Sequence, residues 1–343
     1  MKELKYVPLA LAMTLGLAGC GSDSSSSGGV AGEAIDLTIL HMNDHHSHLA
    51  PDTFDLDVSA LNLESGAEEV EVTYGGFPML VSQFDLLSSV STNTLKLHAG
   101  DAITGTLYYT LFEGSADADM MNQICFDAFA LGNHEFDGGD SGLASFLDVL
   151  NSSSSCSTPV LAANVVPAET SAIAEGYIQP YTTFEFEGET VGVIGIDIAS
   201  KTKNSSFPDE GTEFLDERTT AQQYINELRA EGINKIILMT HYQYENDLEL
   251  AAKLSGVDVI VGGDSHTLLG GSTFTDLSIG NPSGEYPTVV TNADGNKVCV
   301  VQAWEYGHML GKLNVKFDGN GNVKSCKGQP YMPVSTEIDG GDT

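Results

Sequence analysis

The sequence predicts an α/β fold, because short β-branched apolar runs alternate along it with segments of helical periodicity. Some of these runs, such as 191–196, are apolar at almost every position, which is typical of strands buried on both faces of a sheet. The 343 residues, 41% of them hydrophobic, are enough for a sizeable core in one large domain or two small ones. The same composition excludes a disordered chain.

Seven segments have the length and composition of strands. They are 35–40, 94–97, 128–131, 160–163, 190–196, 235–239 and 257–261. Between them, residues 143–150 and 221–228 carry apolar side chains at i, i+3, i+4 and i+7, which predicts two helices packed on a core. Gly232 is placed to end the second helix.

The last third of the chain predicts antiparallel strands joined by tight turns. Residues 288–291, 297–303 and 310–317 are expected to form these strands, with turn signals at 294–295 and 318–319. Residues 51–71 are acidic and weakly periodic, so we expect an inserted surface loop there. The polar tail, 336–343, is expected to be loose.

The N-terminus has the features of a bacterial export signal. Lys2 and Lys5 precede an apolar run, 7–19, that is too short to span a bilayer. The run ends in Leu17-Ala18-Gly19-Cys20, which resembles a lipobox and implies cleavage before Cys20 and lipidation of its thiol. We therefore expect a signal peptide at 1–19, a Gly/Ser-rich tether at 20–33, and an exported lipoprotein at the outer membrane, in the periplasm or at the cell surface.

Four cysteines follow the signal peptide, and an even number in an exported protein favours disulfides. Three pairings are possible. We favour Cys125–Cys156 and Cys299–Cys326, because each closes a modest loop; the alternative is buried free thiols. None of the spacings resembles a C-x₂₋₄-C zinc knuckle.

The charge of the chain excludes two classes of partner. Lys and Arg number 14 against 48 Asp and Glu, a formal net charge of −34. So few basic residues cannot form a cationic patch that displaces counterions from a nucleic acid. We expect no nucleic-acid partner, and contact with a membrane only through the lipid anchor.

Polar clusters follow five of the expected strands, each at the point where the strand ends. They are 43–46, 100–101, 132–135, His241 and 262–267. Because ligands of α/β sheets bind beyond the carboxyl ends of the strands, the five clusters can converge on one site.

The residue types in these clusters favour a metal site. Asp, His and Asn offer oxygen and imidazole ligands, which suit Zn, Mn, Fe or Mg. Asp44 and His46 have the D-x-H spacing that points two side chains the same way on an extended strand end. A carboxylate such as Asp101 can bridge two divalent cations about 3.5–4 Å apart, the arrangement used for displacement at phosphorus.

The five clusters, in this order, resemble those of the calcineurin-like metallophosphoesterases. Their motifs are D-x-H at 44–46, G-D-x₃-G at 100–105, G-N-H-E at 132–135, His241, and G-G-D-S-H-T at 262–267. Segments 40–46 and 131–137 are similar to signatures of the bacterial periplasmic 5′-nucleotidase, UDP-sugar hydrolase and NAD nucleotidase branch. The resemblance covers about residues 34–335. It implies a catalytic domain built as a sandwich of two mixed β-sheets flanked by helices, with the metal site at the carboxyl ends of the strands.

The resemblance also implies a role for each matching residue. One divalent cation would be held by Asp44, His46 and His266, the second by Asn133, His241 and Asp264, and Asp101 would bridge the two. His134 would contact the phosphate and stabilise charge on the transition state or leaving group, with Asp137 orienting its imidazole. A hydroxide bound to the metals would attack phosphorus. His41, His45, His48, His98 and His308 are expected to lie outside the ligand set.

Two departures from the family pattern bear on function. Asp264 stands where the family often carries His, a variant that we associate with a branch that includes NAD-cleaving nucleotidases. Family members usually carry a further C-terminal domain that clamps the nucleoside, and we expect that domain to be absent here, since the chain ends where it would begin.

We therefore expect a metal-dependent phosphoric ester hydrolase that acts on a nucleotide, either a 5′-nucleoside monophosphate or an NAD- or UDP-sugar-like substrate. The alternatives are a cyclic-nucleotide phosphodiesterase or sulfur-ester hydrolase on the same scaffold, and a lipoprotein that binds metal or nucleotide without turnover.

Overall fold

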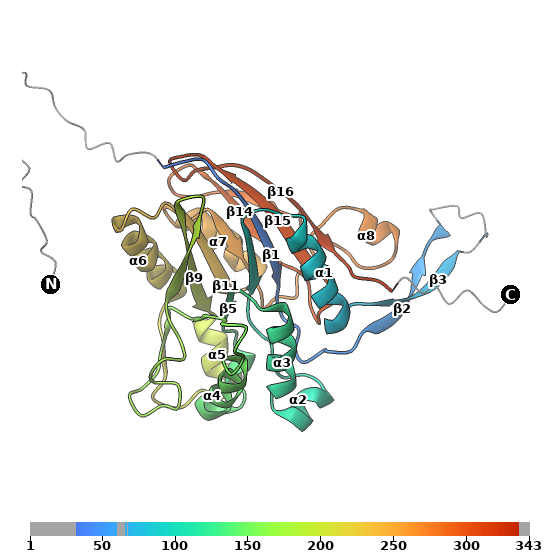
Figure 1. Ribbon diagram of the computed structural model, residues 1–343, viewed down its shortest axis with the longest axis horizontal. Helices are drawn as coiled ribbons and strands as arrows, with labels where there is room; N and C mark the ends of the chain where they lie inside the picture. Colours follow the sequence, from blue (N-terminus) through green and yellow to red (C-terminus); the bar gives the residue numbers. More distant parts are fainter. Residues whose placement is uncertain (1–31, 60–65, 67, 336–343) are drawn as a thin grey trace, which may run out of the picture. The chain divides into compact units, whose positions relative to one another are not determined.

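Two mixed β-sheets flanked by helices form the body of the structure, a computed structural model that describes residues 32–59, 66 and 68–335 (Figure 1). The expected α/β sandwich is confirmed. One core cluster fills the space between the two sheets and continues under α6 and α7, and a second lies between the first sheet and α1, α3 and α4. The described helices are α1 (Phe77–Ser89), α2 (Leu107–Phe112), α3 (Ser115–Ile124), η2 (His134–Phe136), α4 (Gly139–Leu150), α5 (Ala199–Ser205), α6 (Glu217–Ala230), α7 (Tyr244–Lys253) and α8 (Thr273–Asp276).

The first sheet has the strand order β16-β15-β1-β4-β5-β6. Its strands are β1 (Asp36–Met42), β4 (Thr94–His98), β5 (Ala128–Ala130), β6 (Val160–Leu161), β15 (Leu310–Phe317) and β16 (Val323–Tyr331). From β1 to β6 the neighbours run parallel, whereas β15 pairs antiparallel with both β1 and β16. The carboxyl ends of β1, β4 and β5 therefore lie along one edge.

The second sheet has the order β13-β14-β12-β11-β9-β8. Its strands are β8 (Tyr181–Phe186), β9 (Glu189–Asp197), β11 (Lys235–His241), β12 (Val259–Val261), β13 (Thr288–Thr291) and β14 (Lys297–Val301). The four central strands are parallel, and the edge strands β8 and β13 are antiparallel to their neighbours. The expected antiparallel pairing is confirmed for β13 with β14 and for β15, but β14 also has a parallel neighbour, β12, which we did not expect. The turn between β13 and β14 predicts their antiparallel pairing. The parallel pairing of β14 with β12 involves a strand that is distant in the chain, so no local turn predicts it.

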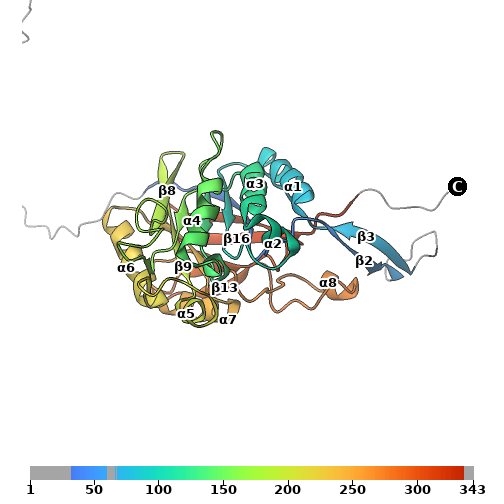
Figure 2. The ribbon, with the colours of Figure 1, turned by 90° about the horizontal axis from the view of Figure 1, so that it is seen from below.

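The acidic segment after β1 is a hairpin, not the loop that we expected. β2 (Asp52–Asp57) and β3 (Glu69–Tyr74) pair antiparallel and extend away from the two sheets (Figure 1, Figure 2). The alternation of Glu69 and Glu71 with Val70 and Val72 was the available signal, because period-two alternation is typical of a strand with one exposed face. A further short pair joins β7 (Val165–Val166) to β10 (Glu213–Phe214).

Two disulfides link parts of the fold that are distant in the chain. Cys125–Cys156 ties the end of α3 to the segment before β6. Cys299–Cys326 ties β14 of the second sheet to β16 of the first. Cross-links of this size restrict the unfolded chain and typically stabilise a fold by about 2–4 kcal/mol. The second one also fixes the two sheets to each other.

The expected signal peptide, Cys20, most of the tether and the tail 336–343 lie outside the described residues. Among the helices that the structure does describe, none combines the length and the hydropathy needed to cross a membrane.

Candidate metal centre

Five loops meet at the carboxyl ends of parallel strands taken from both sheets. β1, β4 and β5 of the first sheet lead into Asp44, Asp101 and Asn133, and β11 and β12 of the second lead into His241 and Asp264. Because the two sets of strand ends adjoin, the structure brings the side chains that the sequence singled out into one place.

Hydrogen bonds tie the loops of the two sheets together at this point. His241 donates from Nδ1 to the carbonyl of Ala99, at 2.8 Å, across the gap between the sheets. The backbone N–H of Asp264 donates to the carboxylate of Asp44, 3.0 Å from Oδ2. The loops are thus positioned against each other by the protein itself.

Asp44, His46 and His266 point three ligand atoms at one spot. The Nε2 atoms of the two histidines are 3.1 Å apart, and Asp44 Oδ1 is 3.3 Å from His266 Nε2 and 3.8 Å from His46 Nε2. Atoms that share a cation through bonds of about 2.0–2.2 Å have separations of this order. These three residues form one of the groups whose side chains are close enough to bind a metal ion.

Each of the three histidines of the centre, His46, His241 and His266, is held in its orientation by a hydrogen bond from its Nδ1 atom. His46 Nδ1 donates to the carbonyl of Thr104 at 3.2 Å, and His266 Nδ1 donates to the carboxylate of Glu305 at 2.6 Å. His241 makes the bond to Ala99 described above. A partner on Nδ1 fixes the ring and turns Nε2 toward the centre, which is the usual arrangement of a histidine that binds a metal. Glu305 was not among the residues predicted from the sequence.

Three other atoms of the centre are buried without a hydrogen-bond partner among the described residues. They are Asn133 Oδ1, His241 Nε2 and Asp264 Oδ2. His241 Nε2 lies 2.9 Å from Asp101 Oδ2 but is not aligned to donate to it. Because an unpaired buried polar atom costs about 1–3 kcal/mol, three of them at one place need an explanation. A divalent cation satisfies all three, so the residues present fit such a group.

The negative charge of the centre is compensated by protons and by one lysine. Burial lowers the pKa of His241, but Asp101 and Asp44 outweigh it and raise that pKa well above its ordinary value. Burial is likewise outweighed at His266, where hydrogen bonds to Asp44 and Glu305 raise the pKa to about 10. Lys201, which the sequence did not single out, forms an ion pair with Asp264 Oδ1. A divalent cation would compete with these positive charges for the same carboxylates.

The backbone at most of these residues is left-handed, although none of them is glycine. Asp44, His46, Asp101, Asp264 and His266 have φ values of 49°, 47°, 54°, 71° and 49°. Such conformations cost about 1–3 kcal/mol each and persist only where the surroundings impose them. The sequence did not predict that the ligands themselves would adopt this geometry.

His134 and Asp137 form a hydrogen-bonded pair at the edge of the centre. His134 Nδ1 donates to Asp137 Oδ2 at 2.6 Å, and the two side chains are 32% and 16% exposed. The bond to Asp137 raises the pKa of His134 above its ordinary value. The ring lies 4.9 Å from that of His46, so it faces both the predicted ligands and solvent.

Four of the remaining histidines are engaged elsewhere in the fold. His41 bonds to Tyr286, and His308 bonds to Asp52 of the hairpin. His45 and His98 bond to each other in the protein interior. These contacts agree with the expectation that the four lie outside the ligand set.

Comparison with models of known protein families identifies the family of this chain. A family model described as calcineurin-like phosphoesterase matches residues 37–268. The chain belongs to this family. The matched segment contains every residue that the sequence proposed as a metal ligand.

Three relatives of this phosphoesterase chain are informative. It is 44% identical to a probable 5′-nucleotidase of Treponema pallidum, over 95% of this chain and 52% of that protein. It is 42% identical to the NAD 5′-nucleotidase of Haemophilus influenzae, over 89% of this chain and 48% of that protein. The solved structure of a Haemophilus influenzae NAD nucleotidase matches with a TM-score of 0.81 and 41% identity, over 88% of this chain and 51% of that one. The chain thus spans about half the length of the curated relatives it matches.

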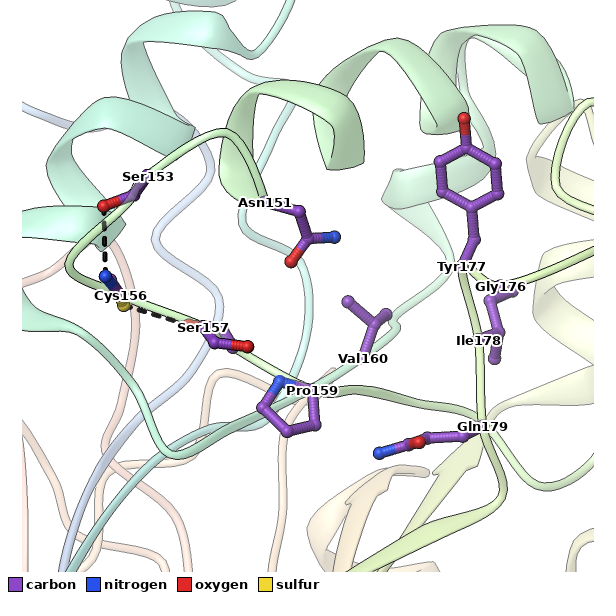
Figure 3. A pocket seen from close by; sticks show the side chains of 11 residues that line it. Asn151, Ser153, Cys156, Ser157, Pro159, Val160, Gly176, Tyr177, Ile178 and Gln179 are labelled. Atoms are coloured by element: carbon purple, nitrogen blue, oxygen red, sulfur yellow. Dashed lines mark hydrogen bonds between the residues drawn. The ribbon is translucent and has the colours of Figure 1, made fainter.

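A separate surface pocket of about 550 Å³ lies beside the Cys125–Cys156 disulfide of this phosphoesterase (Figure 3). Residues 151, 153, 156–160 and 176–179 line it, and none of these is charged. The sequence singled out only Cys156 among them, as a disulfide partner, so we assign the pocket no role in the chemistry.

Glu135 is the residue of the phosphoesterase motifs whose role sequence reasoning missed. Its side chain is fully buried and accepts four backbone N–H groups. Oε2 is 2.6 Å from the nitrogen of Gly132 and 2.9 Å from that of Asp101, and Oε1 is 2.7 Å from that of Ala102 and 3.4 Å from that of Ile103. One carboxylate therefore fastens the G-D-x₃-G loop to the G-N-H-E loop and supports the left-handed backbone of Asp101.

We expect Glu135→Gln to destabilise the metal-free protein by about 2–4 kcal/mol, because the new amide would direct N–H groups at two backbone N–H donors. Urea unfolding in the presence of EDTA measures the change. Glu217→Gln is the matched control, since Glu217 is also buried but accepts one backbone N–H, that of Ala199. Equal stability losses in the two variants would contradict the role given to Glu135.

Proposed function

We propose that this chain hydrolyses phosphate esters or anhydrides of nucleotides with the help of two divalent cations. The observation that carries the proposal is the convergence of potential ligand side chains at the carboxyl ends of five strands, beside the oriented His134–Asp137 pair; three of them, Asn133, His241 and Asp264, each have a buried and unpaired atom. The names of the relatives, 5′-nucleotidase and NAD 5′-nucleotidase, support a 5′-nucleoside monophosphate or an NAD-like dinucleotide as substrate.

The residues divide into two proposed ligand sets. Asp44, His46 and His266 would hold one cation and Asn133, His241 and Asp264 the other, with Asp101 shared between them. Bound cations of this kind neutralise phosphate charge and lower the pKa of a bound water toward 7. The donor set of oxygen and imidazole atoms suits Zn, Mn, Fe or Mg.

The protein would supply the proton chemistry through His134. Asp137 accepts the hydrogen on Nδ1 and so leaves Nε2 of the imidazole for the substrate. A protonated Nε2 can donate to a phosphoryl oxygen or to the departing oxygen, which stabilises the charge that develops there. The partial exposure of His134, in contrast to the buried Asp101, is consistent with contact to a substrate that enters from solvent.

We also propose that the chain is an exported lipoprotein carried on Cys20, which the lipobox-like Leu17-Ala18-Gly19-Cys20 supports. The two disulfides are consistent with an oxidising compartment such as the periplasm.

Replacing the shared carboxylate tests the metal chemistry. We expect Asp101→Asn to lower kcat/KM by about 10³-fold or more, because charge stabilisation by such cations supplies several kcal/mol. Hydrolysis of AMP, NAD and UDP-glucose is measured with Mn²⁺, and EDTA should abolish it reversibly. The control is Asp258→Asn, at a buried carboxylate that accepts the N–H of Ile236 away from the centre. Undiminished activity in Asp101→Asn or in EDTA would refute the mechanism, and metal binding without turnover of any substrate would leave only a binding role.

A second pair of variants tests the proton donor. We expect His134→Asn to lower kcat by about 10²–10⁴-fold while the affinity for Mn²⁺ stays unchanged, since the lost group acts on the substrate. Asp137→Asn should give a smaller loss, because the imidazole remains but is no longer oriented. Single-turnover rates and Mn²⁺ titration separate the two effects. A lowered Mn²⁺ affinity with an unchanged rate at saturating metal would show that His134 is a ligand instead.

Lipidation is tested by comparing the full chain with Cys20→Ala in a bacterial host. The unchanged chain should partition into the detergent phase and carry acyl groups on the peptide that begins with Cys20, as mass spectrometry would detect. The variant should lose both properties. Retention of Cys20→Ala in the detergent phase would rule out this anchor.

A further inference from the structure

Behind the D-x-H loop lies a buried polar cluster that the proposed chemistry does not use. It consists of His45, Ser47, His98 and Asp117, all of them inaccessible to solvent. Asp117 Oδ1 lies 3.2 Å from His45 Nε2, and Asp117 Oδ2 accepts the hydroxyl of Ser47 at 3.0 Å. The other nitrogen of His45, Nδ1, lies 2.8 Å from His98 Nε2. One carboxylate therefore holds two side chains of the loop.

Each hydrogen bond of the cluster has a defined donor and acceptor when Asp117 is ionised. In this ionised state Asp117 can only accept, so that His45 donates from Nε2 and accepts at Nδ1 from His98. His98 is packed edge-on against Phe126 and Phe129, with ring centroids 5.3 Å apart in each case. The ring of His45 thus has a hydrogen-bond partner at each of its nitrogens.

In the loop that this cluster holds, three of the four residues 44–47 have left-handed backbone although none is glycine. Asp44, His46 and Ser47 have φ values of 49°, 47° and 55°. Backbone bonds to neighbouring segments support it, among them those from the N–H of His46 to the carbonyl of Asp101 and from the N–H of Ser47 to the carbonyl of Ala102, at 3.1 and 3.0 Å. The side chains of the cluster add fixed points on both sides of His46, at His45 and at Ser47.

Asp117 belongs to a different part of the fold from the loop. It lies in the first turn of α3, where the positive end of the helix dipole favours a carboxylate. α3 packs in the core cluster against α1 and α4 and is tied at its end by Cys125–Cys156. The loop is thus attached to a rigid element behind the first sheet.

We propose that Asp117 is a positioning residue for the cation held by Asp44, His46 and His266. It acts through His45 and Ser47, which keep the strained backbone of the loop in the conformation that aims two ligands at one spot. The inference rests on the proposed two-cation function. Outer partners of this kind typically contribute 10–100-fold to metal affinity.

The test measures Mn²⁺ binding by calorimetry for four forms of the metal-free full chain: the unchanged chain, Asp117→Asn, His266→Ala and Asp140→Asn. We expect the unchanged chain to bind two Mn²⁺ ions, and Asp117→Asn to weaken by about 10-fold or more the step that His266→Ala removes. Asp140→Asn is the matched control. Asp140 is equally buried and accepts two hydroxyls, from Ser171 and Thr212, but it touches no part of the loop. The Asp140→Asn variant should unfold at a lower urea concentration than the unchanged chain. Its affinities for both Mn²⁺ ions should stay within about twofold of those of the unchanged chain.

Each outcome decides a different point. Unchanged Mn²⁺ affinities in Asp117→Asn would overturn the inference and leave the proposed function intact, and so would equal losses in Asp117→Asn and Asp140→Asn. Failure of the unchanged chain to bind two Mn²⁺ ions would overturn the proposed function itself. If Asp117→Asn does not fold, Ser47→Ala takes its place, since it removes one of the two bonds to Asp117. If Ser47→Ala weakens the Mn²⁺-binding step that His266→Ala removes, the inference is supported. If the affinity of that step is unchanged, the inference is overturned.

Discussion

Mutual repulsion among buried carboxylates is the constraint on which the rest of this structure depends. Asp44, Asp101 and Asp264 lie almost entirely out of solvent and within 4 Å of the same imidazole, that of His241. Like charges this close in a medium of low dielectric repel strongly unless positive charge is placed among them. The raised pKa values of His241 and His266, and the ion pair from Lys201, are the response of the protein alone. Cations would replace these protons with a larger and better placed positive charge.

Holding such a centre together takes support from outside it. Most of the proposed ligands have left-handed backbone conformations. Two carboxylates that are not proposed ligands, Glu135 and Asp117, hold their loops in place. Glu135 binds four backbone N–H groups around Asp101, and Asp117 binds the side chains on either side of His46. The strain and its restraints are therefore found at the same positions, as expected where a site is built in advance of its ligand. The disulfide Cys299–Cys326 and the hydrogen bond from His241 to Ala99 hold the two sheets in a fixed position relative to each other.

The sequence predicted those parts of this arrangement that depend on local pattern. Apolar runs located most strands of both sheets, and polar residues at their ends located Asp44, Asp101, Asn133, His241 and Asp264, because parallel strands deliver their ends to one edge. Features set by tertiary neighbours were missed. The parallel pairing of β14, the partner of Asp264 at Lys201, and the role of Glu135 depend on which elements meet in space. Even the hairpin β2–β3 was misread, since its acidic composition hid a regular alternation.

The bond from Asp264 to Asp44 joins residues that are 220 positions apart. During synthesis, a growing chain therefore cannot present a complete binding place for either proposed ion until the segment after β12, which carries Asp264 and His266, has left the ribosome. A shorter chain lacks at least one ligand of each proposed set. Which ion is captured is then decided wherever the finished chain first folds, by the ions present in that compartment.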